Sequence, residues 1–185
     1  MTYWAIDCGI TTEDKEIMLE EISLASEWED NFRGCQVLQV SNQLPKTLQI
    51  LDQKVFTWMH PVGKINVLKT PINTPLAPHI DSKISELKEK KHKFRIALSG
   101  DIEKLYFYDK YMNKVYVPKY DTYVMDGTHL HGVDPCKTEK ITLCIGSPWT
   151  GLDHYNSLHS FKVDKPTTIK EEWVIPRLRD KNVPN

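Results

Sequence analysis

The sequence predicts an α+β fold that is mainly β, in which two N-terminal helices support a core of roughly eight strands. Three observations lead to this prediction. The 185 residues match one domain of ordinary size. Apolar residues recur at helical spacing near the N-terminus. From about residue 54, short segments rich in β-branched and aromatic residues follow closely, each bounded by Pro, Gly, Asn or Asp. This spacing favours a sandwich or barrel over βαβ units.

The N-terminal part is expected to contain a strand, a helix, a second strand and a second helix. Residues 3–8 are predicted to form a short edge strand, and residues 11–30 a helix that Thr11 or Thr12 can cap. Glu13 and Asp14 favour the positive end of this helix dipole. The helix has apolar residues at helical spacing, which are Met18, Ile22, Ala25 and Trp28. A strand over 35–40 and a helix over 44–53, opening near Pro45, complete this part.

The remainder is read as a series of strands followed by an extended tail. The expected strands lie at residues 64–70, 75–81, 93–100, 104–110, 114–120, 122–127 and 140–149. We therefore expect a single domain over residues 1–185. Its helical support covers about 1–53, its β core about 54–150, and its C-terminal arm about 151–185.

Composition restricts the class of partner and the compartment. With 24 Lys and Arg against 25 Asp and Glu, the net charge of −1 gives no electrostatic reason to expect a nucleic-acid or membrane partner. The four cysteines form no CxxC pair, which argues against a zinc knuckle or a disulfide framework. The N-terminus lacks the order of a signal peptide, and no apolar run approaches the ~18–20 residues that span a bilayer. We expect a soluble, cytoplasmic protein; the sequence favours no particular oligomeric state.

Two short motifs could together supply a metal site. His79 and Asp81 lie two apart in a predicted strand, so that their side chains project from the same face. Further on, His129 and His131 are again two apart, just after another predicted strand. Two histidines and one carboxylate on one face of a metal are typical of non-haem Fe(II) oxygenases, whereas a zinc hydrolase leaves one position open among similar ligands. The residues alone do not separate these alternatives, and a lone HxD can simply form surface hydrogen bonds.

The order of these parts resembles a known family. Residues 64–149 are similar to the double-stranded β-helix, a jelly roll or cupin-like barrel, of Fe(II)/2-oxoglutarate-dependent dioxygenases. The branch they resemble most is that of the aspartyl/asparaginyl β-hydroxylases and the prolyl hydroxylases. The similar segments are "KINVLKTPINTPLAPHIDS", "KFRIALSG", "DTYVMDGTHLHGVD" and "KITLCIGSPW". The resemblance implies that Fe(II) is held by His79, Asp81 and His131 as the catalytic metal ligands, with 2-oxoglutarate and O₂ as cosubstrates. His131 is preferred to His129 because the family ligand is followed directly by a small or polar turn, here Gly132-Val133.

One position departs from the family pattern. Most relatives place an arginine about ten residues after the distal histidine, where its planar fork binds the cosubstrate carboxylate. Here Lys140 stands nine residues after His131, and Thr142 lies on the same face of the predicted strand. Arg95, in "KFRIALSG", matches the other arginine of the branch. We therefore expect the 2-oxoglutarate contacts among Arg95, Lys140 and Thr142.

These features predict an Fe(II)/2-oxoglutarate-dependent dioxygenase that hydroxylates a C–H bond. The expected substrate is an amino acid, a peptidyl side chain or another small metabolite. The alternative is a non-catalytic, cupin-type module that binds a small molecule. A nucleic-acid demethylase of the same superfamily is disfavoured, because the arginine pair after the distal histidine is missing and the net charge is near neutral.

Overall fold

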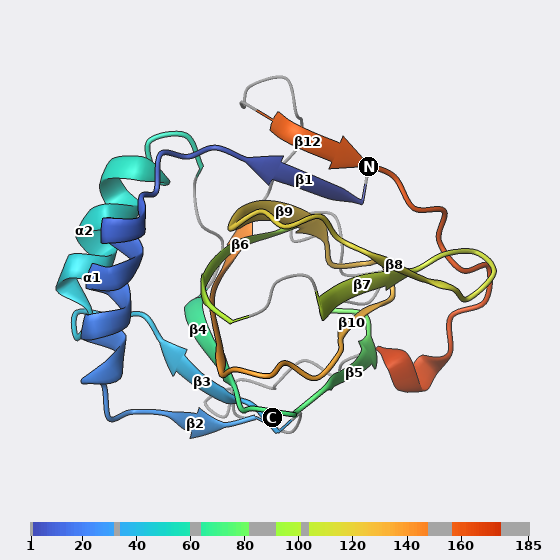
Figure 1. The fold of residues 1–185 in the computed structure, drawn as a ribbon, viewed down its shortest axis with the longest axis horizontal. Coiled ribbons are helices and arrows are strands. Elements are labelled where there is room, and N and C mark those ends of the chain that lie inside the picture. The colour runs from blue at the N-terminus through green and yellow to red at the C-terminus, as the bar shows by residue number, and fades with distance from the viewer. Residues whose placement is uncertain are drawn as a thin grey trace, which may run out of the picture.

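Two antiparallel sheets face each other in the computed structural model, which describes residues 2–31, 34–59, 64–81, 92–100, 104–147 and 157–174. The large sheet has the order β12 (Ser157–Phe161), β1 (Tyr3–Ile6), β9 (Thr122–Asp126), β6 (His92–Ser99), β11 (Lys140–Ser147), β4 (Ile65–Thr70), β3 (Gln36–Gln39) and β2 (Glu29–Asp30). The small sheet has the order β5 (Leu76–His79), β10 (His131–Val133), β7 (Leu105–Tyr108) and β8 (Lys114–Tyr116). Seen along the barrel, the large sheet curves around and the small sheet closes the opposite side (Figure 1).

Both N-terminal helices cover the outer face of the large sheet (Figure 1). Helix α1 (Thr12–Ser23) begins with a capping box, in which Thr11 and Asp14 exchange side-chain and backbone hydrogen bonds. Helix α2 (Pro45–Lys54) begins with proline, which lacks the N–H that a first helical turn leaves unpaired. An ion pair between Lys54 and Asp14 joins the two helices.

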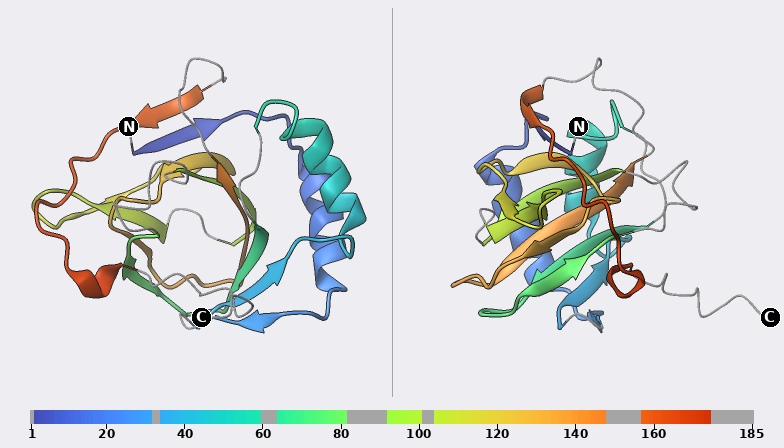
Figure 2. Two further views of the ribbon diagram at one scale, coloured as in Figure 1. Left: turned by 180° about the vertical axis from the view of Figure 1, so that it is seen from behind. Right: turned by 90° about the vertical axis from the view of Figure 1, so that its right-hand side faces the viewer.

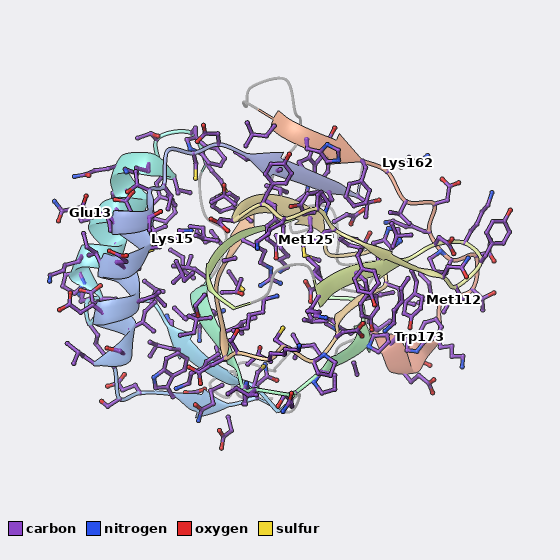
Figure 3. All side chains as sticks on the ribbon, viewed as in Figure 1. Glu13, Lys15, Met112, Met125, Lys162 and Trp173 are labelled. Atoms are coloured by element: carbon purple, nitrogen blue, oxygen red, sulfur yellow. The ribbon has the colours of Figure 1, made fainter. Side chains whose placement is uncertain are left out.

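The alternation of side chains along the strands produces two apolar clusters, one on each face of the large sheet. Odd- and even-numbered residues point to opposite faces of a strand. Outward-facing residues of β6 and β11, such as Phe94 and Leu143, pack against Met18, Ile22 and Leu51 of the helices. Inward-facing residues of the sheets form the second cluster, between the layers. Met125 lies in this inner cluster, as Figure 3 shows, and the inner face of the large sheet is the face that can carry a site.

Two predictions about the N-terminal part are wrong. The first helix ends at Ser23 rather than at residue 30, because Glu29 and Asp30 form β2 and pair with Gln36 and Val37 of β3. Tertiary strand pairing overrides the local helical pattern here. The first strand is also no edge strand, since β1 pairs with β9 on one side and with β12 on the other. Its second partner comes from the C-terminal arm, which local sequence does not reveal.

The C-terminal arm adds a strand and then runs along the barrel. After β12 it descends the side opposite the helices, from β1 towards β5 (Figure 2). It ends, in the described part of the chain, in a short 3-10 helix, Glu171–Trp173. The N–H of Ile80 donates to the carbonyl of Trp173 at 2.8 Å. The arm therefore contacts the backbone between His79 and Asp81.

Candidate metal centre

Pairing of two short strands brings the histidines of the two motifs together. His131 of β10 is the register partner of His79 of β5. Directly opposite residues in antiparallel strands project from the same face, and the two imidazole ring centroids lie 4.3 Å apart. Strand β10 was not predicted, because a three-residue strand that contains Gly132 shows no alternating pattern.

Asp81 completes the group. Its Oδ1 lies 3.4 Å from Nε2 of His79, and its Oδ2 lies 3.8 Å from Nε2 of His131. One ligand atom from each of the three residues lies within 4.8 Å of the others, and all three side chains are largely buried. The structure thus brings together the three residues that the sequence nominated as metal ligands.

Hydrogen bonds at the far side of each ring fix which nitrogen faces Asp81. Nδ1 of His79 lies 2.7 Å from the carbonyl of Ala77, and Nδ1 of His131 lies 2.7 Å from the carbonyl of His129. Because a carbonyl only accepts, each Nδ1 carries the proton, and each Nε2 presents its lone pair to the centre. Such an outer hydrogen bond is the usual support of a metal-binding histidine.

The protonation states also suit a metal. Burial alone would raise the pKa of Asp81, but its electrostatic interactions with His131, His79 and Arg95 hold it well below its usual range. Burial and the neighbouring His79 lower the pKa of His131 to about 3. An ionised carboxylate therefore lies beside a neutral imidazole near pH 7, which is the state that binds metal ions.

Asp81 is also positioned by its backbone and has one carboxylate oxygen without a hydrogen bond. Its N–H donates to the carbonyl of Gly127 at 2.8 Å. Its Oδ2 is buried and has no hydrogen-bond partner among the residues that the structure describes. The guanidinium of Arg95 lies 3.5 Å away and offsets part of its charge, and a buried carboxylate oxygen without a hydrogen bond can still accept a further cation. The donor set therefore fits a metal ion with nitrogen and oxygen ligands.

A small cavity of about 50 Å³ opens from the centre into the space between the sheets. His79, His131 and Arg95, together with apolar side chains, line the end of the cavity next to the candidate metal ligands, here called its metal end. The polar residues that line it elsewhere are Thr70, Tyr123, Lys140 and Thr142. All three predicted cosubstrate contacts thus border the same cavity as the histidines.

Register explains the order of the polar groups along the cavity. Lys140 and Thr142 occupy alternate positions on β11, and Cys144 follows two residues later, beside its register partner Arg95 on β6. Four residues separate Lys140 from Cys144, so the backbone of Lys140 lies roughly 13 Å along β11 from the position beside Arg95. Thr142 Oγ1 is buried without a hydrogen-bond partner in the described part of the chain. Thr70, the register partner of Lys140 on β4, was not predicted as a residue of the cavity wall. Alternation in "KINVLKT" could have indicated it, because it places Thr70 and Leu68 on one face.

Arg95 lies nearer to the metal end than the other two predicted contacts. Its Nη2 is 3.5 Å from Asp81 Oδ2, and its Nη1 donates to Sγ of Cys144. The charges of Arg95 and Asp81 face each other in a buried place, with 13% and 11% of their side chains exposed. Arg95 is thus a neighbour of a proposed metal ligand as well as a wall of the cavity.

His129 faces away from the centre. Its Nε2 donates to the carbonyl of Tyr108 at 2.7 Å, and its Nδ1 lies 3.4 Å from Oγ1 of Thr2. Both ring nitrogens therefore have protein neighbours outside the group of three. This geometry agrees with the preference for His131.

Comparisons with known proteins identify the fold. No protein-family model and no curated protein sequence matches the chain. A prolyl hydroxylase from Trichoplax adhaerens, solved with a hypoxia inducible factor peptide fragment, superposes with a TM-score of 0.63 at 11% identity, over 79% of this chain and 83% of that chain. A Pseudomonas putida prolyl-4-hydroxylase gives 0.61 at 14% identity, over 81% and 94%.

A third solved structure extends the comparison to a bound cosubstrate. HygX from Streptomyces hygroscopicus, with nickel and 2-oxoglutarate bound, gives a TM-score of 0.59 at 11% identity, over 89% of this chain and 92% of that chain. The predicted fold, a mainly β double-stranded β-helix with N-terminal helices, is confirmed. Separately, no described helix has the length and apolar character needed to cross a membrane.

Proposed function

We propose that the chain is an Fe(II)- and 2-oxoglutarate-dependent dioxygenase that hydroxylates a C–H bond. The substrate class is an amino acid, a peptidyl side chain or another small metabolite. One observation carries the proposal. Two imidazole nitrogens and one carboxylate converge at one end of a cavity that has Lys140 and Thr142 along its wall.

The ligand set favours ferrous iron. Two histidines and one carboxylate on one side of the ion leave the other positions open, which is the arrangement of non-haem Fe(II) oxygenases. His79, His131 and Asp81 would supply these ligands, and Asp81 Oδ2 is the buried oxygen that a cation would satisfy. A fold shared with prolyl hydroxylases supports this choice over a zinc hydrolase.

The cavity suits a short dicarboxylate. Lys140 is 6% exposed and can bind a carboxylate as a point charge. The hydroxyl of Thr142, which has no hydrogen-bond partner among the described residues, can donate a second hydrogen bond. These two residues would hold the far carboxylate of 2-oxoglutarate, and Arg95 would lie near its metal end. HygX, of the same fold, binds 2-oxoglutarate.

In the reaction, a bound Fe(II) centre with 2-oxoglutarate and O₂ supplies the oxidising chemistry: 2-oxoglutarate, O₂ and substrate C–H yield succinate, CO₂ and an alcohol. The protein's own residues would hold the metal ion and orient the cosubstrate. His79, Asp81 and His131 would hold the ion, and Lys140 and Thr142 would orient the cosubstrate. Apolar side chains exclude water around them, namely Leu68, Leu76, Leu105, Met125 and Val133.

The test uses purified protein under anaerobic conditions. We expect Fe(II) and 2-oxoglutarate together to give a weak visible charge-transfer band, and His79→Ala and Asp81→Ala to abolish iron retention while the fold persists. Admission of O₂ should then yield succinate even without substrate, at a slow rate. Bound iron with neither band nor succinate would favour the non-catalytic binding module. Iron retained by both variants as in the parent would refute the ligand assignment.

A further inference from the structure

We propose that Lys165, in the C-terminal arm, and Thr2, at the N-terminal end, are positioning residues for the metal centre. They act by holding the segment Asp126–Leu130, here called the support turn. The inference rests on the proposed metal site, because it concerns how that site is kept in shape. It is carried by three sets of contacts: from the support turn to the ligands, from Lys165 to the turn, and from Thr2 to the turn.

The support turn contacts two of the three proposed ligands directly. The carbonyl of Gly127 accepts the N–H of Asp81 at 2.8 Å, and the carbonyl of His129 accepts Nδ1–H of His131 at 2.7 Å. The fit is close, since a Cβ on Gly127 would lie 3.2 Å from both Cβ and Oδ2 of Asp81. A shift of the turn would therefore move a carboxylate and an imidazole at once.

Lys165 fastens the turn from outside. Its Nζ lies 2.9 Å from Oδ2 of Asp126 and also donates to Oγ1 of Thr128. The other oxygen of Asp126 accepts the N–H of Thr128 at 2.9 Å. Asp126 is 3% exposed, so its charge needs partners such as these. Burial alone would raise the pKa of Asp126, but the bonds from Thr128 and Lys165 keep it below its ordinary value.

Thr2 holds the same turn from the other end of the chain. Its carbonyl accepts the N–H of Asp126 at 3.0 Å, and its Oγ1 lies 3.4 Å from Nδ1 of His129. That hydroxyl also accepts the N–H of Val163 at 3.0 Å and lies 3.2 Å from the carbonyl of Val163. Thr2 thus joins the turn to the arm that carries Lys165.

The consequence for binding follows from the position of these contacts. Lys165 and Thr2 are not among the described residues that line the cavity, yet they contact the turn whose carbonyls orient Asp81 and His131. Loss of a group that hydrogen-bonds a metal ligand typically weakens metal binding about 10–100-fold, and displacement of the support turn would disturb two such bonds. A residue that only stabilised the fold would leave the affinity of the folded protein unchanged.

The experiment measures Mn(II) affinity of the full chain by calorimetry, for the parent and for Lys165→Met. The matched control is Lys162→Met, which removes the same charge from the same arm. Lys162 is 69% exposed and pairs with Asp164 at 3.6 Å, and it points outwards in Figure 3. We expect Lys165→Met to bind Mn(II) at least about tenfold more weakly, Lys162→Met to match the parent, and Lys165→Arg to recover most of the loss.

Thr2→Val supplies a second variant that keeps the shape of the side chain, for use if Lys165→Met does not fold. We expect it to weaken Mn(II) binding in the same direction. Parent-like affinity in a folded Lys165→Met or Thr2→Val protein would overturn the inference. A parent that binds no Mn(II) would instead refute the proposed metal site, so the two failures are distinguishable.

Discussion

Gly100 lies directly against the backbone of Lys140, at the point where β6 ends and β11 begins. A Cβ on Gly100 would be 2.7 Å from Cα of Lys140 and 3.0 Å from the carbonyl oxygen of Glu139, and φ of Gly100 is +87°. No side chain fits there without moving the start of β11. Glycine at this place therefore sets the position of the cavity's lysine.

We predict that Gly100→Ala destabilises the protein and weakens 2-oxoglutarate binding together. Positive φ alone costs about 1 kcal/mol for alanine, and the collision with β11 adds about 1–3 kcal/mol. The matched control is Gly9→Ala, because Gly9 has φ of +71° but nothing within 4 Å of its Cβ position. Urea unfolding and 2-oxoglutarate titration check both. Equal effects of the two variants would show that crowding at Lys140 is unimportant.

Lys140→Met and Thr142→Val should each raise the 2-oxoglutarate concentration needed for half-saturation. A hydrogen bond to a charged group contributes about 1.5–3 kcal/mol, so the lysine variant should lose roughly 10- to 100-fold. The valine variant removes a neutral donor and should lose less. Lys69→Met is the control, since Lys69 belongs to the neighbouring β4 but lies over the ring of Trp28. Unchanged saturation in both cavity variants would place the carboxylate elsewhere.

Arg95→Gln should destabilise the metal-free protein by about 3–5 kcal/mol, because it leaves the buried charge of Asp81 without its cationic neighbour. Metal ions would then replace the lost charge. We therefore expect Mn(II) to raise the melting temperature of the variant more than that of the parent. Thermal melting with and without Mn(II) measures this difference. An equal or smaller rise in the variant would contradict the role of Arg95 as the counter-charge.

Acid should weaken the contact between the two helices through Asp14. Partial burial raises the pKa of Asp14, but hydrogen bonds from Lys54 and Thr11 more than offset this and lower it below its usual value. A depressed carboxyl pKa contributes stability that is present above the unfolded pKa of about 3.9 and is lost as pH falls further. Asp14→Ala should cost about 1 kcal/mol at pH 7 and less at pH 3.

Urea unfolding at both pH values measures the Asp14 effect. Glu13→Ala serves as the control, because Glu13 occupies the same helical turn but is exposed and points outwards (Figure 3). An Asp14 variant whose deficit is the same at pH 3 as at pH 7 would contradict the electrostatic part of this account.

Local patterns were sufficient to predict most of the strands and the group of three residues. Short segments rich in β-branched and aromatic residues, such as "KFRIALSG" and "KITLCIGSPW", correctly predicted β6 and β11, and the spacing of His79 and Asp81 nominated two residues that the structure places together. These are properties of single strands and short segments, which sequence periodicity reports directly. The role of the three residues as iron ligands stays a prediction.

Contacts between distant segments could not be predicted. Arg95 of β6 lies beside Asp81, which follows β5 of the other sheet, and Thr2 reaches His129 across 127 residues. Likewise, the place of β1 inside the sheet depends on β12. Nothing in the letters near Tyr3 or Ile6 reports a partner from the far end of the chain. Register and strand order are tertiary properties, and they determine which polar groups share the cavity.

The position of β1 has a consequence for synthesis on the ribosome. Strand β1 pairs with β9 and β12, so after its synthesis residue 122 must follow before it meets one partner and residue 157 before it meets the other. Contacts so distant in sequence slow folding. A nascent chain released before Lys165 would carry all three proposed iron ligands and still lack the brace on their scaffold.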